Sequence, residues 1–218
     1  MKTTRKSTKL LAVAAAASLV FAACGGTGGV LIWAHEQEPP DLHLDDPENN
    51  LSSTAWLRTA LLEGAYGISA TTEFYPELLA QEAEMTDNGD GTFTATYTLR
   101  DGLMWSDGEA LTANDFKWTF DAIMYADGVD DEGNPNYVYL LGDRTGLDTI
   151  TSVEVVSDTE FKVTWSAFFA GWKAVFAEVY PAHQFSADPA EAAAQLNDAL
   201  REWQAPDGNV IASSGPMV

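Results

Sequence analysis

Alternation of apolar and polar residues predicts two β-hairpins in this chain. Residues 92–99 place Phe, Ala, Tyr and Leu on one side of a strand and threonines on the other. This period of two is typical of a half-buried strand. The turn sequence Asp-Asn-Gly-Asp-Gly at 87–91 predicts a partner strand near residues 83–86. Residues 150–156 and 160–165 alternate in the same way around a Ser-Asp-Thr turn, which predicts the second hairpin.

Helical spacing of apolar residues predicts four helices. The first covers Ser52–Leu62, with serine as its N-terminal cap. The second begins after Thr112, where Asp115 stands three residues on in the capping-box position. An aromatic helix is predicted over residues 168–177 and an alanine-rich amphipathic helix over residues 189–203.

The remaining segments are predicted to be short or irregular. Residues 30–34 form an apolar run that indicates a buried strand, and residues 35–50 form a proline-containing loop. A turn or short helix is expected at 75–80 and a tight turn at 106–108. Residues 127–136 are acidic and glycine-rich, which predicts a loop. Strands and helices together indicate an α/β fold.

The N-terminal segment has the pattern of a secretory leader. Residues 1–9 are basic, residues 10–23 are an apolar run, and small residues come just before Cys24. This three-part pattern predicts a signal peptide over residues 1–23. The apolar run is too short for a membrane-spanning helix of about 20 residues.

The end of the leader, Ala22-Ala23-Cys24, resembles a bacterial lipoprotein signal. The resemblance implies that the Cys24 thiol accepts lipid and becomes the first residue of the mature chain. Cys24 is the only cysteine, so no intramolecular disulfide can form. Residues 24–29 are glycine-rich and are expected to act as a flexible tether. The alternative is an ordinary signal peptide with a chance cysteine near its cleavage site.

Net charge excludes one class of partner. The chain has 11 basic and 33 acidic residues, and four basic residues precede Leu10. Removal of the leader therefore leaves 7 basic against 33 acidic residues, a formal charge of −26. An acidic surface repels nucleic acid and anionic lipid headgroups, so no nucleic-acid partner is expected.

Several stretches together resemble one protein family. The most specific is Leu-Arg-Asp-Gly-Leu-Met-Trp-Ser-Asp-Gly at 99–108, followed by Thr112, Asp115 and Phe120. In the same order along the chain come segments at 75–80, 153–163, 180–183 and 214–216. Together they are similar to the bacterial extracellular solute-binding proteins of the peptide and nickel class, family 5. The Trp-Ser-Asp-Gly run itself is interpreted as structural, because its Asp-Gly makes a turn and its Trp is a large buried anchor.

The resemblance implies a periplasmic-binding-protein-like fold of class II, cluster C type. This chain is expected to form the first lobe only, with mixed sheets and flanking helices and with the second lobe absent. Residues 30–54 and 181–218 are predicted to belong to the main N-terminal lobe. Residues 55–180 are predicted to form an inserted α/β subdomain that carries the Trp-Ser-Asp-Gly signature.

The resemblance also implies a function in uptake. A lipid-anchored monomer outside the cytoplasmic membrane would capture peptides or similar solutes and deliver them to the permease of an ABC importer. No reaction, cofactor or bound metal is expected. Two alternatives remain open: a surface lipoprotein with a signalling or scaffolding role on the same fold, and a hydrolase that uses an acidic pair.

Five residues are candidates for ligand contact. The predicted strand at 30–34 would bring Glu36, Gln37 and Glu38 to the rim of the cleft, where a carboxylate can pair with an amino group. Tyr137 and Tyr139 follow the acidic loop in a region that faces the ligand in peptide receptors. The alternatives are a solvated loop for the first three and core packing for the tyrosines.

Other chemistry is poorly supported. Pro39 stands where a zinc-protease helix beginning at His35-Glu36 needs its second histidine. No G-x-S-x-G motif is present, and the three histidines lack metal-ligand spacing. The acidic groups at 127–132 and 87–90 do not match the calcium-loop template, so turns are favoured there.

Overall fold

A four-stranded antiparallel sheet organises the computed structural model, which describes residues 38–43, 45–49 and 51–216. Its strands are β3 (Glu84–Asp87), β4 (Phe93–Thr98), β7 (Ile150–Ser157) and β8 (Glu160–Trp165), in the order β3-β4-β8-β7. Both predicted hairpins are thereby confirmed. The two hairpins join through β4 and β8, where Tyr97 is paired with Phe161. All of these elements belong to the unit formed by residues 37–218.

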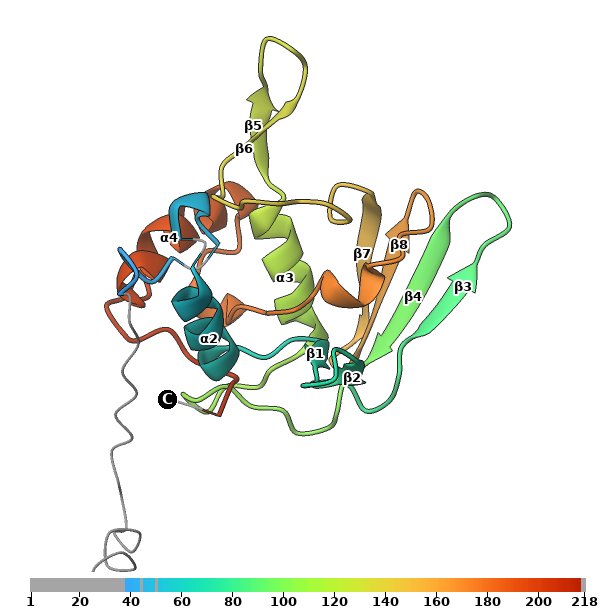
Figure 1. Cartoon of the computed structure of the whole chain (residues 1–218), viewed down its shortest axis with the longest axis horizontal. Helices are drawn as coiled ribbons and strands as arrows, with labels where there is room; N and C mark the ends of the chain where they lie inside the picture. Colours follow the sequence, from blue (N-terminus) through green and yellow to red (C-terminus); the bar gives the residue numbers. More distant parts are fainter. Residues whose placement is uncertain (1–37, 44, 50, 217–218) are drawn as a thin grey trace, which may run out of the picture. The chain divides into compact units, whose positions relative to one another are not determined.

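Helix α3 (Ala113–Ile123) covers one face of this sheet (Figure 1). Thr112 caps it, and the Asp115 carboxylate accepts the Thr112 backbone N–H at 2.7 Å, as the capping-box pattern predicts. Phe116 stacks on Phe161 with ring centroids 4.7 Å apart, and Phe161 stacks on Tyr97 at the same distance. The alternating strand residues therefore form the core between α3 and the sheet.

Helices α2 (Ser52–Leu61) and α4 (Pro189–Glu202) lie on the side of α3 away from the sheet (Figure 1). Both were predicted, but serine does not cap α2. Leu51 is the capping position, and its N–H donates to the Thr54 hydroxyl at 3.3 Å. Asp188 caps α4 by accepting the N–H groups of the first turn. No helix of the described ranges is long and apolar enough to cross a membrane.

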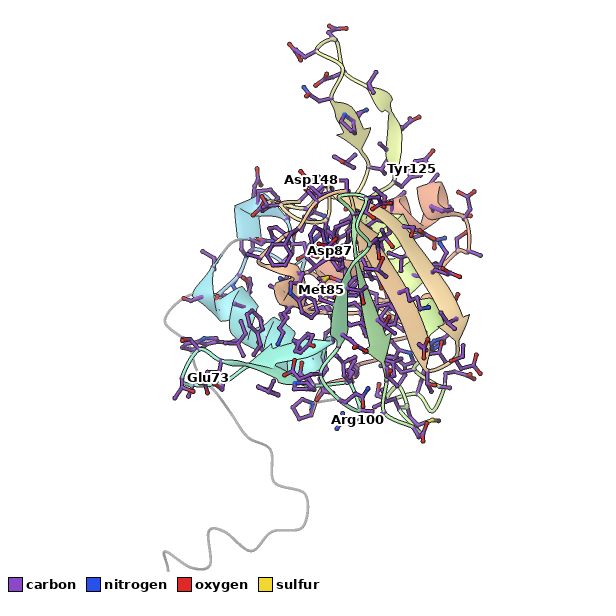
Figure 2. The ribbon with its side chains drawn as sticks, turned by 90° about the vertical axis from the view of Figure 1, so that its right-hand side faces the viewer. Glu73, Met85, Asp87, Arg100, Tyr125 and Asp148 are labelled. Atoms are coloured by element: carbon purple, nitrogen blue, oxygen red, sulfur yellow. The ribbon has the colours of Figure 1, made fainter. Side chains whose placement is uncertain are left out.

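Two segments predicted to lack strands contain them. Strand β2 (Phe74–Pro76) pairs with β1 (Tyr66–Ile68), where a turn or short helix was predicted at 75–80. The acidic loop is a hairpin of β5 (Ala126–Val129) and β6 (Pro135–Tyr137). Its turn is built by Asp130, whose carboxylate accepts N–H groups from Glu132 and Asn134 at 3.0 and 2.8 Å. Figure 2 shows Tyr125 at the base of this hairpin, which extends away from the sheet.

The predicted aromatic helix at 168–177 is wrong. Only Trp172–Ala174 form a short 3-10 helix, η2, and the segment otherwise runs irregularly from the sheet toward α2 (Figure 1). Its rings serve different partners: Trp172 meets Tyr66 at 5.9 Å, whereas Phe176 packs on Phe116 at 5.9 Å. Both rings also meet the edge of Tyr97, each at 6.1 Å, so these tertiary contacts form without a regular helix. Two more 3-10 helices are η1 (Pro47–Asn49) and η3 (Ala182–Gln184).

The Trp-Ser-Asp-Gly turn holds the last described segment of the chain. Trp105 is buried and Gly108 has a φ of 95°, a conformation that favours glycine. The Ser106 N–H donates to the carbonyl of Ser213 at 2.9 Å, and the Ser214 N–H donates to the carbonyl of Leu61 at 3.1 Å. The turn is therefore a structural element, as the sequence indicated.

Strand pairing in the described ranges is antiparallel throughout. The mixed pairing expected of the whole lobe is not seen in this part of it. The predicted signal peptide, the tether and the strand at 30–34 lie outside the described residues. The α/β class is confirmed.

Candidate functional site

A cavity of about 400 Å³ lies beside a buried group of charged side chains. Arg58 reaches it from α2, Thr119 and Ile123 from α3, and the two irregular segments on either side of the β7–β8 hairpin close it. Its lining residues are Asp45, Arg58, Thr119, Ile123, Leu141, Asp143, Thr145, Leu147, Phe169, Gly171, Ala174, Val175, Ala177, Glu178 and Tyr180. The cavity is in the size range of small-molecule sites in proteins.

Arg58 connects two carboxylates at one end of this cavity. Its Nη2 is paired with Asp45 Oδ1, and its Nε lies 2.9 Å from Glu178 Oε2. The side chain of Arg58 is 26% exposed, that of Asp45 11% and that of Glu178 13%. Charges this deeply placed need partners, because the loss of hydration is otherwise uncompensated. We refer to these three residues as the Asp45–Arg58–Glu178 triad.

Two tyrosine hydroxyls complete the coordination of Asp45. Tyr139 donates to Asp45 Oδ2 at 2.6 Å and Tyr180 donates to the same oxygen at 3.1 Å. Burial raises the pKa of Tyr180 to about 12 and the pKa of Tyr139 well above its ordinary value. Both hydroxyls therefore stay protonated at neutral pH and act as donors.

Burial shifts the pKa of Glu178 and opposes the shift of Arg58. It raises the pKa of Glu178, and the nearby Arg58 only partly opposes this. Burial alone would lower the pKa of Arg58, but the Glu178 carboxylate together with Tyr180 and Tyr139 outweighs it, so that pKa is raised. With one guanidinium against two carboxylates, the triad has a formal charge of −1 when all three are ionised.

The loop that carries Asp45 is fixed on α4. The buried ring of His43 stacks on Tyr139 at 5.3 Å, and its Nε2 is 3.1 Å from Asn197 Oδ1. The Asp46 N–H donates to His43 Nδ1 at 3.2 Å, so Nε2 carries the proton that Asn197 accepts. Burial lowers the pKa of His43, which keeps the ring neutral. This scaffold positions Asp45 and Tyr139 next to each other.

The arrangement is suited to binding. Within the described ranges, no three His, Cys, Asp or Glu side chains are grouped so as to hold a metal ion. Asp45 has both oxygens engaged by Arg58 and the tyrosines. The cavity therefore has one charged end, and the rest of its lining is mainly apolar. It can receive a ligand that carries both a polar group and an apolar part.

The structure tests the placement of only some predicted site residues. Cys24, Glu36 and Gln37 lie outside the described residues. Glu38 is exposed, and no hydrogen bond or ion pair joins it to another described residue. The structure thus does not bring Glu38 to the tyrosines.

Tyr137 and Tyr139 are brought together by Arg144. The guanidinium lies 4.1 Å from the centre of the half-buried Tyr137 ring, and its Nη2 donates to the carbonyl of Tyr139 at 2.6 Å. Tyr139 is 1% exposed and reaches the cavity through Asp45 and Tyr180. Its observed contacts are those of a residue that positions the triad.

Sequence reasoning missed the triad itself. A signal for it is present: Glu178 interrupts the apolar run Val-Phe-Ala-Glu-Val-Tyr at 175–180, and Arg58 is one of few basic residues after the leader. A charge inside an apolar run indicates a buried partner. The sequence does not say which of many carboxylates that partner is.

Comparisons with known proteins agree with this fold. Residues 73–216 match the bacterial extracellular solute-binding proteins, family 5, in their middle part. The dipeptide-binding protein of Lactococcus lactis subsp. cremoris is 35% identical over 95 residues, which is 39% of this chain and 16% of that protein. A probable monoacyl phosphatidylinositol tetramannoside-binding protein of Mycobacterium tuberculosis is 29% identical over 129 residues, covering 59% of this chain and 18% of that protein.

Solved structures share the fold. A periplasmic EDTA-binding protein superposes with a TM-score of 0.68 at 23% identity, covering 88% of this chain and 33% of that one. The oligopeptide-binding protein of Thermus thermophilus, complexed with a pentapeptide, superposes with a TM-score of 0.59 at 17% identity. The superposition covers 83% of this chain and 33% of that one. The chain thus spans about a third of these structures and less of the curated relatives.

The family match covers more than half of the chain and includes the Trp-Ser-Asp-Gly turn, α3 and the central sheet. Family members are extracellular solute-binding proteins. This chain belongs to the bacterial extracellular solute-binding proteins of family 5.

Proposed function

We propose that this chain is part of a substrate-binding lipoprotein that captures peptides or similar solutes and delivers them to an ABC importer. The match of residues 73–216 to family 5 carries the proposal. The similarity to a dipeptide-binding protein supports a peptide-like solute. Capture would take place between two lobes that close on the ligand, of which this chain supplies part of the first. The protein would work as a monomer and catalyse no reaction.

The proposal includes the lipid anchor on Cys24. Lipid and tether would keep the receptor beside its permease on the outer side of the cytoplasmic membrane. Two or more acyl chains on one cysteine give stable attachment, whereas a single chain would not. Glu36, Gln37 and Glu38 remain proposed ligand contacts on the rim of the cleft, and Tyr137 and Tyr139 remain proposed contacts beside it. Residues 55–180 remain the proposed inserted subdomain.

Uptake in the source organism tests the transport function. Deletion of the gene should abolish the accumulation of labelled di- and oligopeptides, and the wild-type gene should restore it. Mass spectrometry of compounds that co-purify with the full receptor should then identify peptides. Unchanged uptake, or the release of metal chelates alone, would refute the peptide assignment.

Cell fractionation tests the anchor separately. Wild-type protein should sediment with membranes, and Cys24→Ser should move to the soluble envelope fraction or the medium. Ser7→Ala provides the control, because it changes the basic part of the leader and leaves Cys24 intact. Membrane association that survives Cys24→Ser would contradict the lipid anchor.

A further inference from the structure

We propose that the cavity beside the Asp45–Arg58–Glu178 triad binds a primary ammonium group carried on an apolar body. The inference rests on the function proposed above, because it names the chemical class of solute group that this lobe receives. It is carried by the lining of the cavity, by the unpaired atoms at its charged end and by the sign of the charge there.

The walls of the cavity are mainly hydrocarbon. Ile123, Leu141, Leu147, Phe169 and Val175 surround a volume of about 400 Å³. Burial of apolar ligand surface against such walls is favourable, and a bare inorganic ion would gain nothing from them. The body of the ligand is therefore expected to be aliphatic or aromatic.

One carboxylate oxygen at the charged end has no partner in the described part of the chain. Asp45 Oδ1 is taken by Arg58, and Asp45 Oδ2 accepts from both Tyr139 and Tyr180. Glu178 Oε2 is taken by Arg58 Nε at 2.9 Å. Glu178 Oε1 is the oxygen that remains, and Glu178 lines the cavity. It is the acceptor that a ligand would meet.

The sign of the charge selects a cation. Two carboxylates face one guanidinium in the triad, and Asp143 adds a further carboxylate to the lining. An anion at Glu178 would meet like charge, and a neutral group without a donor would leave this oxygen unpaired. An ammonium group supplies both the opposite charge and the N–H donors.

The unused Nη1 donor of Arg58 indicates which ligand atom lies next to the ammonium group. Its Nη2 is hydrogen-bonded to Asp45 and its Nε forms an ion pair with Glu178, whereas no hydrogen bond joins its Nη1 to another described residue. Nη1 can donate to a carbonyl or hydroxyl oxygen close to the ammonium group. An amine with a neighbouring oxygen would therefore bind more tightly than a simple amine.

Three probes of similar size separate charge from shape. The full 218-residue chain is titrated with phenethylamine, 2-phenylethanol and 3-phenylpropionate, and binding is followed by amide chemical shifts. Phenethylamine should bind at least about tenfold more tightly than the other two, since a charge-assisted hydrogen bond is roughly twice as strong as a neutral one. Equal affinities, or tightest binding of 3-phenylpropionate, would overturn the proposal.

Two variants locate the binding. Ala174→Trp fills the cavity from η2 and should weaken phenethylamine binding strongly, whereas Ala194→Trp, on the exposed side of α4, should leave it unchanged. Glu178→Gln keeps an acceptor for Arg58 and should remove most of the preference for phenethylamine over 2-phenylethanol. Thermal unfolding confirms that each variant is folded. A preference retained in both Ala174→Trp and Glu178→Gln would place the amine elsewhere and refute the site.

Failure here and failure of the transport function are distinguishable. Peptide uptake that requires the gene, without amine binding in the cavity, would leave the importer assignment standing and remove only this site. Amine binding in the cavity without any uptake phenotype would support this site and remove the importer assignment.

Discussion

Ser106 and Ser213 bond to each other in both directions across 107 positions of the chain. The Ser106 N–H donates to the Ser213 carbonyl at 2.9 Å, and the Ser213 N–H donates to the Ser106 hydroxyl at 2.9 Å. The Trp-Ser-Asp-Gly turn and the Ser-Gly-Pro segment, two of the stretches that identify the family, therefore hold one another in place.

Ser106→Ala tests this contact. Ser213 is buried, so loss of the hydroxyl acceptor should lower the free energy of unfolding by about 1–3 kcal/mol. Ser152→Ala, on the exposed side of β7, should change it by less than about 0.5 kcal/mol. Urea unfolding of both variants measures the difference, and equal midpoints would show that the contact contributes nothing.

Gly215→Ala tests the close approach of the same segment to α2. A Cβ atom at Gly215 would lie 2.5 Å from the carbonyl oxygen of Ala60, which is too close without a backbone shift. Overpacking of this kind should cost about 1–3 kcal/mol of unfolding free energy. At Gly142 the nearest atom would be 3.7 Å away, so Gly142→Ala should be neutral or slightly stabilising. Similar thermal midpoints for the two variants would contradict the predicted steric overlap between residue 215 and Ala60.

Tyr139→Phe tests the support of Asp45. The variant keeps the ring that stacks on His43 but removes a hydrogen bond to a carboxylate, so the free energy of unfolding should fall by about 1.5–3 kcal/mol. Tyr137→Phe leaves the contact of that ring with Arg144 in place and should have little effect. The prediction fails if chemical denaturation finds Tyr137→Phe as costly as Tyr139→Phe.

Glu63→Gln should stabilise the protein at neutral pH. Burial and the neighbouring Glu77 carboxylate raise the pKa of Glu63 above its ordinary 4.5, so the folded state holds the proton more tightly than the unfolded state. The ionised side chain therefore costs stability above the raised pKa, and this cost disappears below pH 4.5. The melting temperature of Glu63→Gln should exceed that of wild type at about pH 7, and the two should converge as the pH falls.

Glu84→Gln is the control for Glu63→Gln, because it removes the same charge from an exposed position on β3. The comparison separates a gain in stability that comes from the environment of Glu63 from a gain that comes from removing any one negative charge. If Glu84→Gln gives the same pH-dependent gain, the environment of Glu63 is not its cause.

Salt should stabilise the chain as a whole. Its formal charge of −22 makes the folded state repel itself, and ions screen this repulsion. The melting temperature should rise between about 0.05 and 1 M NaCl, a range over which the screening length falls severalfold, and choline chloride should give a similar rise. A fall with both salts would contradict net self-repulsion, and a rise with sodium alone would indicate specific ion binding.

The sequence predicted best those elements whose signal is local. The alternation at 92–99 and the capping pair Thr112 and Asp115 are read directly in the structure. The segment at 168–177 misled because aromatic spacing suggested a helix, whereas Trp172 and Phe176 reach Tyr97 from a largely irregular segment. The hairpin of β5 and β6 was missed because its strands are short and largely exposed.

The candidate site was predicted less well, for a related reason. Tyr139 was singled out, but its observed role depends on Asp45, 94 positions away in the chain. Arg58 and Glu178 meet because the segment after β8 returns to the end of α2, and the Ala65 N–H just beyond that helix donates to the Phe176 carbonyl at 2.8 Å. Pairing across such distances is not encoded in local spacing.

The pairing of β4 with β8 has a consequence for biosynthesis. Thr94 and Thr164, cross-strand neighbours in the sheet, are separated by 70 residues, so the sheet cannot close until the chain beyond Trp165 has left the ribosome. Non-local pairing of this kind slows folding. For a chain with a predicted export leader, slow closure of the sheet lengthens the time in which the unassembled strands can reach a translocation channel.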